Sequence, residues 1–223
     1  ALTGDAARST VVSVNTAGLN IAVLIAAVLG SLIITGEYST GMIRSTFAAV
    51  PRRTGAIAAK AVVLAVTTFL ATSVGIWVSA LITSPILAAK DVEVQLGEPS
   101  VFLPLLGGAV FVTMIALLAF GFGIILRSTA GTLATALGLL LVVPIILSIL
   151  GALTQGADWV TTVSALMPQS AGSKLFGYAS TDTATVSTGG GLVLNGWGGF
   201  GVLSAWVVAV LALALTLVKR RDA

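Results

Sequence analysis

The sequence predicts an all-α fold, a polytopic membrane helix bundle. Hydrophobic types make up 57% of the 223 residues and charged types only 9%, whereas a soluble domain carries roughly 25% charged residues. Because so few charged residues cannot cover a water-facing surface, a large part of the chain must face lipid. Five apolar stretches reach the length of about 20 residues that a helix needs to cross the hydrocarbon core, and a helix satisfies its own backbone groups there.

The five predicted spans are each too long for an ordinary strand. They lie at about residues 17–35, 56–82, 102–126, 132–153 and 200–218. Pro144 interrupts the fourth span and predicts a kink there, whereas Pro104 lies near the start of the third, where proline is common.

The basic residues indicate the orientation of these spans. If the spans alternate in direction, eight basic residues fall on one side of the membrane: Arg44, Arg52, Arg53, Lys60, Arg127, Lys219, Arg220 and Arg221. The other side receives three basic and six acidic residues. The positive-inside rule makes the first side cytoplasmic, with the C-terminus inside and residue 1 outside. We expect one further span upstream of Ala1; the alternative is a five-span protein with an external N-terminus.

Several chemistries have no residues to support them. Cysteine and histidine are absent, so disulfides, thiolate metal sites and a histidine general base are excluded. No span carries an acidic residue at its middle, which argues against the buried relays that are common in ion-coupled transporters. No phosphate-binding G-x-x-x-x-G-K-[ST] loop occurs. The chain itself is therefore expected to be neither an ATPase nor another enzyme, and no metal, cofactor or nucleic acid is expected on it.

Residues 37–50, at the predicted cytoplasmic face, have the pattern of a short amphipathic helix lying on the membrane surface. Tyr38, Met42, Ile43, Phe47 and Val50 fall toward one side of it, and Ser39, Thr40, Arg44 and Ser45 toward the other. Pro51 is expected to end this helix, and Glu37 to cap its N-terminus, where negative charge is favoured.

A long external segment, residues 154–199, carries few charges. It contains an apolar patch, Trp159–Met167, and overlaps a glycine-rich run, Gly189–Gly201. Two interpretations remain open: the segment dips partly into the bilayer, where protein or water must cover non-helical backbone, or it is an ordinary surface loop.

Small residues recur at four-residue spacing in two spans. The stripes are Ala22, Ala26 and Gly30 in the first span, and Ala130, Ala134 and Gly138 in the fourth. Such stripes allow close helix packing within a subunit or across a dimer, although alanine and glycine are common enough here for some stripes to arise by chance.

The segment from Ile34 to Val63 resembles the cytoplasmic segment of permease subunits from ABC type-two exporters, particularly bacterial ones. The resemblance lies in an ordered series after an apolar span: Glu37, Tyr38, Gly41, Pro51, Arg52, Arg53 and Lys60. A short basic turn beginning at Arg127, a long external segment before the last span, and a basic C-terminus also fit. The resemblance covers essentially the whole chain as one permease domain, although the family usually has six spans and five are visible here.

The resemblance implies a permease that pairs with a second copy or paralogue in the bacterial plasma membrane and binds two separate cytoplasmic ATPase subunits, which hold the ATP and Mg²⁺. Residues 37–50 would then be a coupling helix that transmits the movement of the ATPases. The residues implied in coupling are Glu37, Tyr38, Gly41, Met42, Arg44, Phe47, Pro51, Arg52 and Arg53.

Other roles remain open for the basic residues and for the chain. Arg52 and Arg53 either pair with carboxylates of a partner or only set topology and contact lipid phosphates. Lys60 is expected to extend toward the lipid headgroups, and Arg127, Lys219, Arg220 and Arg221 to anchor the cytoplasmic side. The alternative functions are a secondary transporter or channel, or a membrane assembly subunit without transport.

Overall fold

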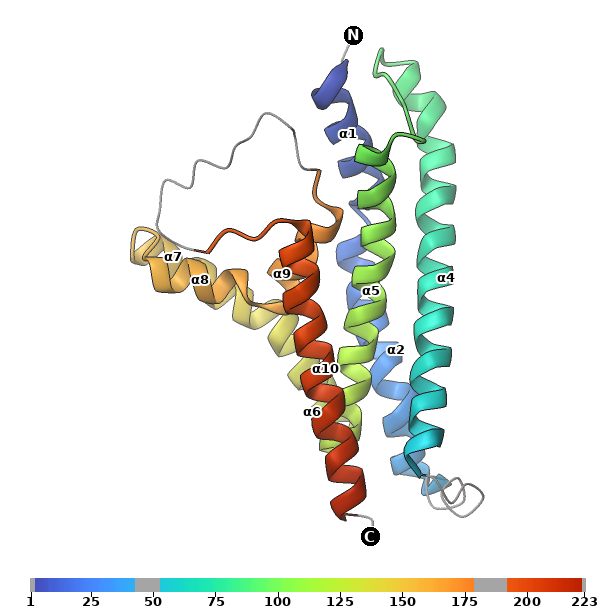
Figure 1. The fold of residues 1–223 in the computed structure, drawn as a ribbon, viewed down its shortest axis with the longest axis vertical. Coiled ribbons are helices and arrows are strands. Elements are labelled where there is room, and N and C mark those ends of the chain that lie inside the picture. The colour runs from blue at the N-terminus through green and yellow to red at the C-terminus, as the bar shows by residue number, and fades with distance from the viewer. Residues whose placement is uncertain (1–2, 43–52, 179–191, 222–223) are drawn as a thin grey trace.

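The computed structural model describes residues 3–42, 53–178 and 192–221, which form a bundle of helices (Figure 1). The elements are α1 Gly4–Thr16, α2 Leu19–Thr40, α4 Arg53–Ala88, α5 Pro99–Leu126, α6 Thr129–Leu137, the π-helix η1 Gly138–Val142, α7 Val143–Leu153, α8 Asp158–Ala165, α9 Pro168–Phe176 and α10 Gly196–Arg221. In this part of the chain, five helical stretches are long and apolar enough to cross a membrane. The predicted all-α bundle is confirmed.

Helix α5 forms the centre of the bundle. It is apolar on all sides, and buried residues occur along its whole length, from Val101 to Ile124, as expected of a helix surrounded by other helices. Helices α1, α2, α4, α6, α9 and α10 all pack against it. Pro99 begins the helix, at a position where the missing N–H of proline costs nothing. It ends at Arg127, which adopts the left-handed conformation with φ 52°.

The largest interface joins α2 and α5, and Gly30 makes it possible. A Cβ atom added at Gly30 would lie 2.2 Å from the carbonyl oxygen of Ala116, far inside ordinary contact distance. Ala26, one turn earlier, is also buried, whereas Ala22 is only half-buried. The first small-residue stripe therefore serves helix packing within the subunit at Ala26 and Gly30.

Helix ends in the structure differ from the predicted span ends. The first span is preceded by α1, and the helix is interrupted at Ala17 and Gly18 before α2 begins. α4 continues to Ala88, beyond the predicted end at residue 82, and α10 begins at Gly196 rather than at residue 200. Hydropathy marks the apolar core of a helix but not the turns that extend beyond it, because these turns carry mixed residues.

The fourth span is divided into three parts. α6 packs on α2 and α5, whereas α7 packs on η1 and α8. The π-helical turn Gly138–Val142 lies immediately before Pro144, at the predicted kink. π-turns and prolines are recognised causes of helix bending. Figure 1 shows α7 and α8 leaning away from the other helices.

The predicted external segment contains two short helices, α8 and α9. α9 packs closely on α5 and α10: a Cβ atom at Gly172 would lie 2.0 Å from the ring of Phe111, and one at Gly199 would lie 2.3 Å from the carbonyl oxygen of Ala171. Phe111 is about 18 Å along α5 from Pro99, at 1.5 Å per residue. This depth favours the interpretation that the segment enters the bilayer region, with α5 and α10 covering α9.

Candidate coupling site at the ends of α2 and α4

The described residues of the predicted coupling site lie at the end of the bundle that carries the C-terminus (Figure 1). Glu37 and Tyr38 occupy the last turns of α2, and Lys60 lies two turns into α4. The residues between Met42 and Arg53 connect these two helices. Whatever acts on that connection therefore acts first on the end of α2 and on the start of α4.

Glu37 and Lys60 form an ion pair between α2 and α4. The ammonium group of Lys60 donates hydrogen bonds to both carboxylate oxygens of Glu37. The side chains are 20% exposed for Glu37 and 24% for Lys60, so much of each charged side chain is shielded from solvent. This corrects one expectation, because Glu37 does not cap the N-terminus of a surface helix. The extension of Lys60 toward the lipid headgroups stays a prediction.

Tyr38, the next residue, connects α2 to the turn between α5 and α6. The guanidinium carbon of Arg127 lies 5.2 Å from the centre of the Tyr38 ring, within the range of a cation–π interaction. The backbone N–H of Arg127 donates to the carbonyl oxygen of Gly123 at 3.0 Å and so caps α5. The adjacent residues Glu37 and Tyr38 thus contact two different segments, α4 and the turn between α5 and α6.

Gly41 ends α2. Its φ of 72° lies in the left-handed region, and its N–H donates to the carbonyl oxygen of Tyr38 at 3.4 Å. Glycine is the usual residue in this C-terminal position because a Cβ atom is disfavoured there. The predicted surface helix therefore cannot begin at Glu37: Glu37–Thr40 continue α2, and the chain turns at Gly41.

The remaining predicted coupling residues are only partly described. Met42 is exposed. Arg53 begins α4, but its side chain lies outside the described residues. Arg44, Phe47, Pro51 and Arg52 also lie outside them. The amphipathic surface helix therefore remains a prediction for residues after Gly41.

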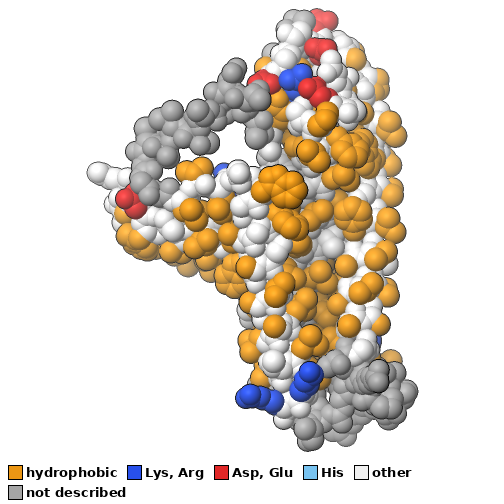
Figure 2. Space-filling view, in the orientation of Figure 1, with side chains coloured by type: hydrophobic (Ala, Val, Ile, Leu, Met, Phe, Trp, Pro, Cys, Tyr) orange, Lys and Arg blue, Asp and Glu red, His pale blue; other side chains and the backbone are white. Residues whose placement is uncertain are grey.

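The two ends of the bundle differ in charge. At the C-terminal end, Lys219 and Arg220 are exposed on α10 (Figure 2); the side chain of Arg221 is outside the described residues. At the opposite end, Figure 2 shows acidic side chains around a basic one. There Nε of Arg8 bonds to Glu98 at 2.8 Å, and Nη1 of Arg8 lies 3.3 Å from Asp5.

The sequence did not predict this charged cluster, whose partners Arg8 and Glu98 are 90 residues apart. The hydroxyl of Tyr178 also donates to Asp5, at 2.8 Å. Burial raises the pKa of Tyr178 above its usual value, and the hydrogen bond to Asp5 adds to the shift. The cluster joins α1, the start of α5 and the residues after α9. Its only sequence signal was the position of these charges on the same predicted side.

The second small-residue stripe has no partner helix in the part of the chain described here. Ala130 and Ala134 are exposed, and a Cβ atom at Gly138 would have no heavy atom within 4 Å. Packing of this stripe against a second copy remains a prediction.

Comparison with protein families gives a match over nearly the whole chain. The family described as ABC-2 family transporter protein matches residues 8–223, and the chain belongs to this family. It is therefore a multi-pass membrane protein of the ABC type-two permease class. No curated protein and no solved structure matches it.

Proposed function

We propose that this protein is the membrane subunit of an ATP-driven exporter, paired with a second copy or a paralogue. Membership of the ABC-2 transporter family supports a permease role. In this proposal, separate cytoplasmic ATPase subunits bind ATP and Mg²⁺, and the permease pair provides the path through the bacterial plasma membrane.

The Glu37–Lys60 ion pair is the observation that supports mechanical coupling between the ATPase subunits and the membrane helices. It joins the last turns of α2 to the start of α4, the two helix ends that flank the connecting residues. A force on the connection would therefore move both helix ends together instead of bending one of them. Tyr38 extends the same link to Arg127 and the α5–α6 turn.

The charge distribution supports a cytoplasmic position for this end. Lys219 and Arg220 are exposed beside it, while Asp5 and Glu98 lie at the other end. Cytoplasmic loops carry an excess of Lys and Arg. In this proposal, an acidic surface on the ATPase subunits complements Arg44, Arg52 and Arg53 of the connection, whereas Lys219 and Arg220 only anchor the cytoplasmic side.

The experiment exchanges the two charges. The variants are E37Q, K60Q and the double exchange Glu37→Lys with Lys60→Glu, each purified with its ATPase subunits in lipid nanodiscs. Each single variant leaves one charge of the pair without its counter-charge, and a hydrogen bond to a charged group contributes about 1.5–3 kcal/mol. Because this interaction holds the two helix ends together during the proposed movement, we expect each single variant to lose about tenfold or more of the substrate-stimulated ATPase rate. The double exchange should recover most of it.

The matched control is K219Q, which removes an exposed lysine from the same end of the bundle. This variant should keep the stimulated rate. Wild-type stimulation in E37Q and K60Q would contradict the coupling role of the pair. Transport in ATP-free liposomes driven by an ion gradient would contradict ATP-driven export altogether.

A further inference from the structure

An apolar groove lies between α10 and the turn that joins α8 to α9. Its volume is about 620 Å³. α9 packs closely on α10, whereas α8 packs on α7 and α9, so the space beside the end of α8 stays open. All the lining side chains are apolar, apart from the N–H of one indole. Leu166 and Met167 line one wall, and Val202, Ala205, Trp206 and Ala209 line the other.

Trp206 connects the two walls of the groove. Its indole Nε1–H donates a hydrogen bond to the carbonyl oxygen of Leu166, at 2.9 Å. Leu166 is the C-terminal cap of α8, and carbonyl groups at this end of a helix have no partner within the helix. The bond therefore satisfies a donor and an acceptor beside an apolar space, and it fixes the distance between α10 and the α8–α9 turn.

The groove lies within the depth of one bilayer leaflet. Trp197, near the start of α10, is 82% exposed, and Lys219 is exposed near its end. These residues are about 33 Å apart at 1.5 Å per residue. Because the hydrocarbon core is about 30 Å thick and exposed Trp and Lys anchor helices at its interfaces, they mark the two headgroup levels. Val202–Ala209 then lie about 8–18 Å below the level of Trp197.

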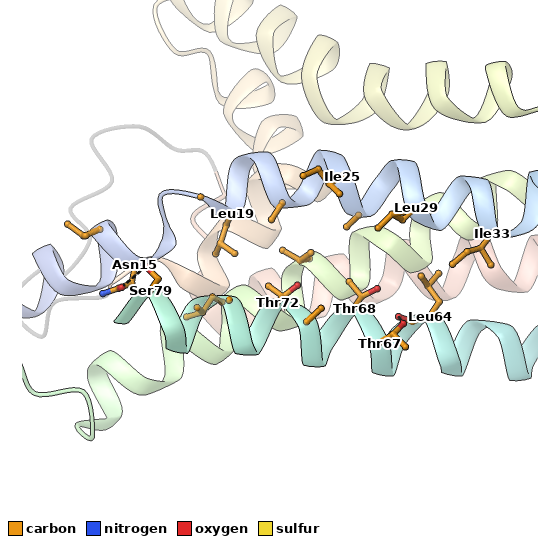
Figure 3. Close-up of a pocket in the computed structure, with 18 residues that line it drawn as sticks. Asn15, Leu19, Ile25, Leu29, Ile33, Leu64, Thr67, Thr68, Thr72 and Ser79 are labelled. Carbon is orange, nitrogen blue, oxygen red and sulfur yellow. Dashed lines mark hydrogen bonds between the residues drawn. The ribbon is translucent and has the colours of Figure 1, made fainter. Parts of the chain in front are cut away.

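The groove between α2 and α4 differs in length and in polarity (Figure 3). Its α4 wall extends from Leu64 to Ser79, about 22 Å, and includes the hydroxyl groups of Thr68 and Thr72. An acyl chain of one leaflet would fill only part of this length and would offer no acceptor to the hydroxyl groups. The shorter groove beside α8 has the depth and the lining that suit a single acyl chain.

Lys174 lies at the end of the groove nearest to the headgroup level. Gly199 shares one face of α10 with Val202 and Trp206, which follow it by three and seven positions. A Cβ atom at Gly199 would lie 3.0 Å from the Cβ atom of Lys174, so the base of this side chain is one turn, about 5 Å, from the level of Val202. Lys174 is exposed and forms no ion pair within the described part of the chain, which leaves its ammonium group available to an anion.

We propose that this groove binds one acyl chain of an anionic phospholipid whose phosphate pairs with Lys174. The lipid belongs to the leaflet on the side of Trp197, and its chain extends between the α8–α9 turn and Ala205. Lysine binds phosphate as a point charge, and a lysine near the membrane surface attracts anionic lipids. The site does not depend on ATP coupling, because it involves only α8, α9 and α10.

Photolabelling with phosphatidylglycerol that carries a diazirine in its acyl chain tests the groove. The purified full polypeptide is irradiated in nanodiscs that contain this lipid, and the adducts are located by mass spectrometry. We expect adducts in the α8–α9 turn and in Val202–Ala209. A205L fills the groove and should lower this labelling several-fold. The matched control, V208L, changes an exposed residue of α10 outside the groove and should leave the labelling unchanged.

A second pair of variants tests the headgroup contact. K174Q should lower the labelling of the groove by about fivefold, the effect of one lysine near a membrane surface. K219Q, which removes an exposed lysine from the other end of α10, should not. Equal labelling of the wild type and A205L, or of the wild type and K174Q, would overturn the proposal. Absence of adducts from the groove, the result expected if a second copy of the chain filled it, would also overturn it.

Discussion

Replacing Gly30 by alanine tests the central packing of the bundle. The added Cβ atom would lie 2.2 Å from the carbonyl oxygen of Ala116, and within 3.1 Å of two further backbone atoms of that residue. The shortest ordinary contact is 3.4 Å, so the helices must separate locally by about 1.2 Å. No side-chain rotation relieves the overlap, because every obstructing atom belongs to the backbone of α5.

The cost follows from overpacking. Extra atoms in a packed core usually destabilise by about 1–3 kcal/mol, and the better helix propensity of alanine returns at most about 1 kcal/mol. Because the overlap is with backbone atoms, the cost lies at the upper end of this range, about 3 kcal/mol, which leaves a net cost of about 2 kcal/mol. Since 1 kcal/mol shifts the melting temperature of a chain of this size by roughly 2–4 °C, Tm should fall by roughly 4–8 °C.

Scanning fluorimetry of the purified protein in detergent measures this shift. The control is G36A, in the same helix, where the added Cβ atom meets no atom within 4 Å, and where Tm should stay the same or rise. Ala116→Gly should not rescue G30A, because the obstruction is the carbonyl oxygen. Equal melting temperatures for G30A and G36A would refute the packing argument.

Two further predictions concern the half of the protein that lies away from the C-terminus. G172A places its Cβ atom 2.0 Å from the buried Phe111 ring; it should lower Tm by several degrees, and F111L should partly restore it, since a side chain causes the overlap. If the decreases in Tm of G172A and F111L simply add in the double variant, the overlap with the Phe111 ring is not the cause. Tyr178 has a raised pKa in the folded protein, so the neutral phenol stabilises the fold below its ordinary pKa of about 10, and this stabilisation is lost as the pH rises above that value. Above pH 10, the Tm of the wild type should therefore fall more steeply with pH than the Tm of Y178F. If the two plots of Tm against pH run parallel, the stabilising hydrogen bond from Tyr178 to Asp5 is contradicted.

Much of the fold was predictable because the bilayer imposes a simple rule on sequence. A helix that faces lipid must be apolar for about 20 residues, and each predicted span contains such a stretch. The close crossing at Gly30 was also visible as a stripe with four-residue spacing. The second stripe, at Ala130 and Ala134, had the same pattern without a partner helix in the described chain, so the pattern alone does not determine which helix it faces.

The candidate site was predictable only in part. The ordered series from Glu37 to Lys60 predicted a coupling site in this segment, which stays a prediction. It did not predict the contact between those two residues, because their separation of 23 residues has no periodic signature. Helical periodicity also continued past the end of the span, so Glu37–Thr40 resembled a new helix. The left-handed turn at Gly41, which ends α2, is a local backbone property that hydropathy does not reveal.

The two halves of the divided fourth span, α6 and α7, pack against different parts of the protein. The inner part, α6, belongs to the packed centre, whereas the outer part, α7, belongs with α8. A π-turn loosens the regular backbone bonding, and Pro144 has no N–H to restore it. A force on α7 and α8 would therefore bend the span first at Gly138–Val142, before it moved α6, which is packed against α2 and α5.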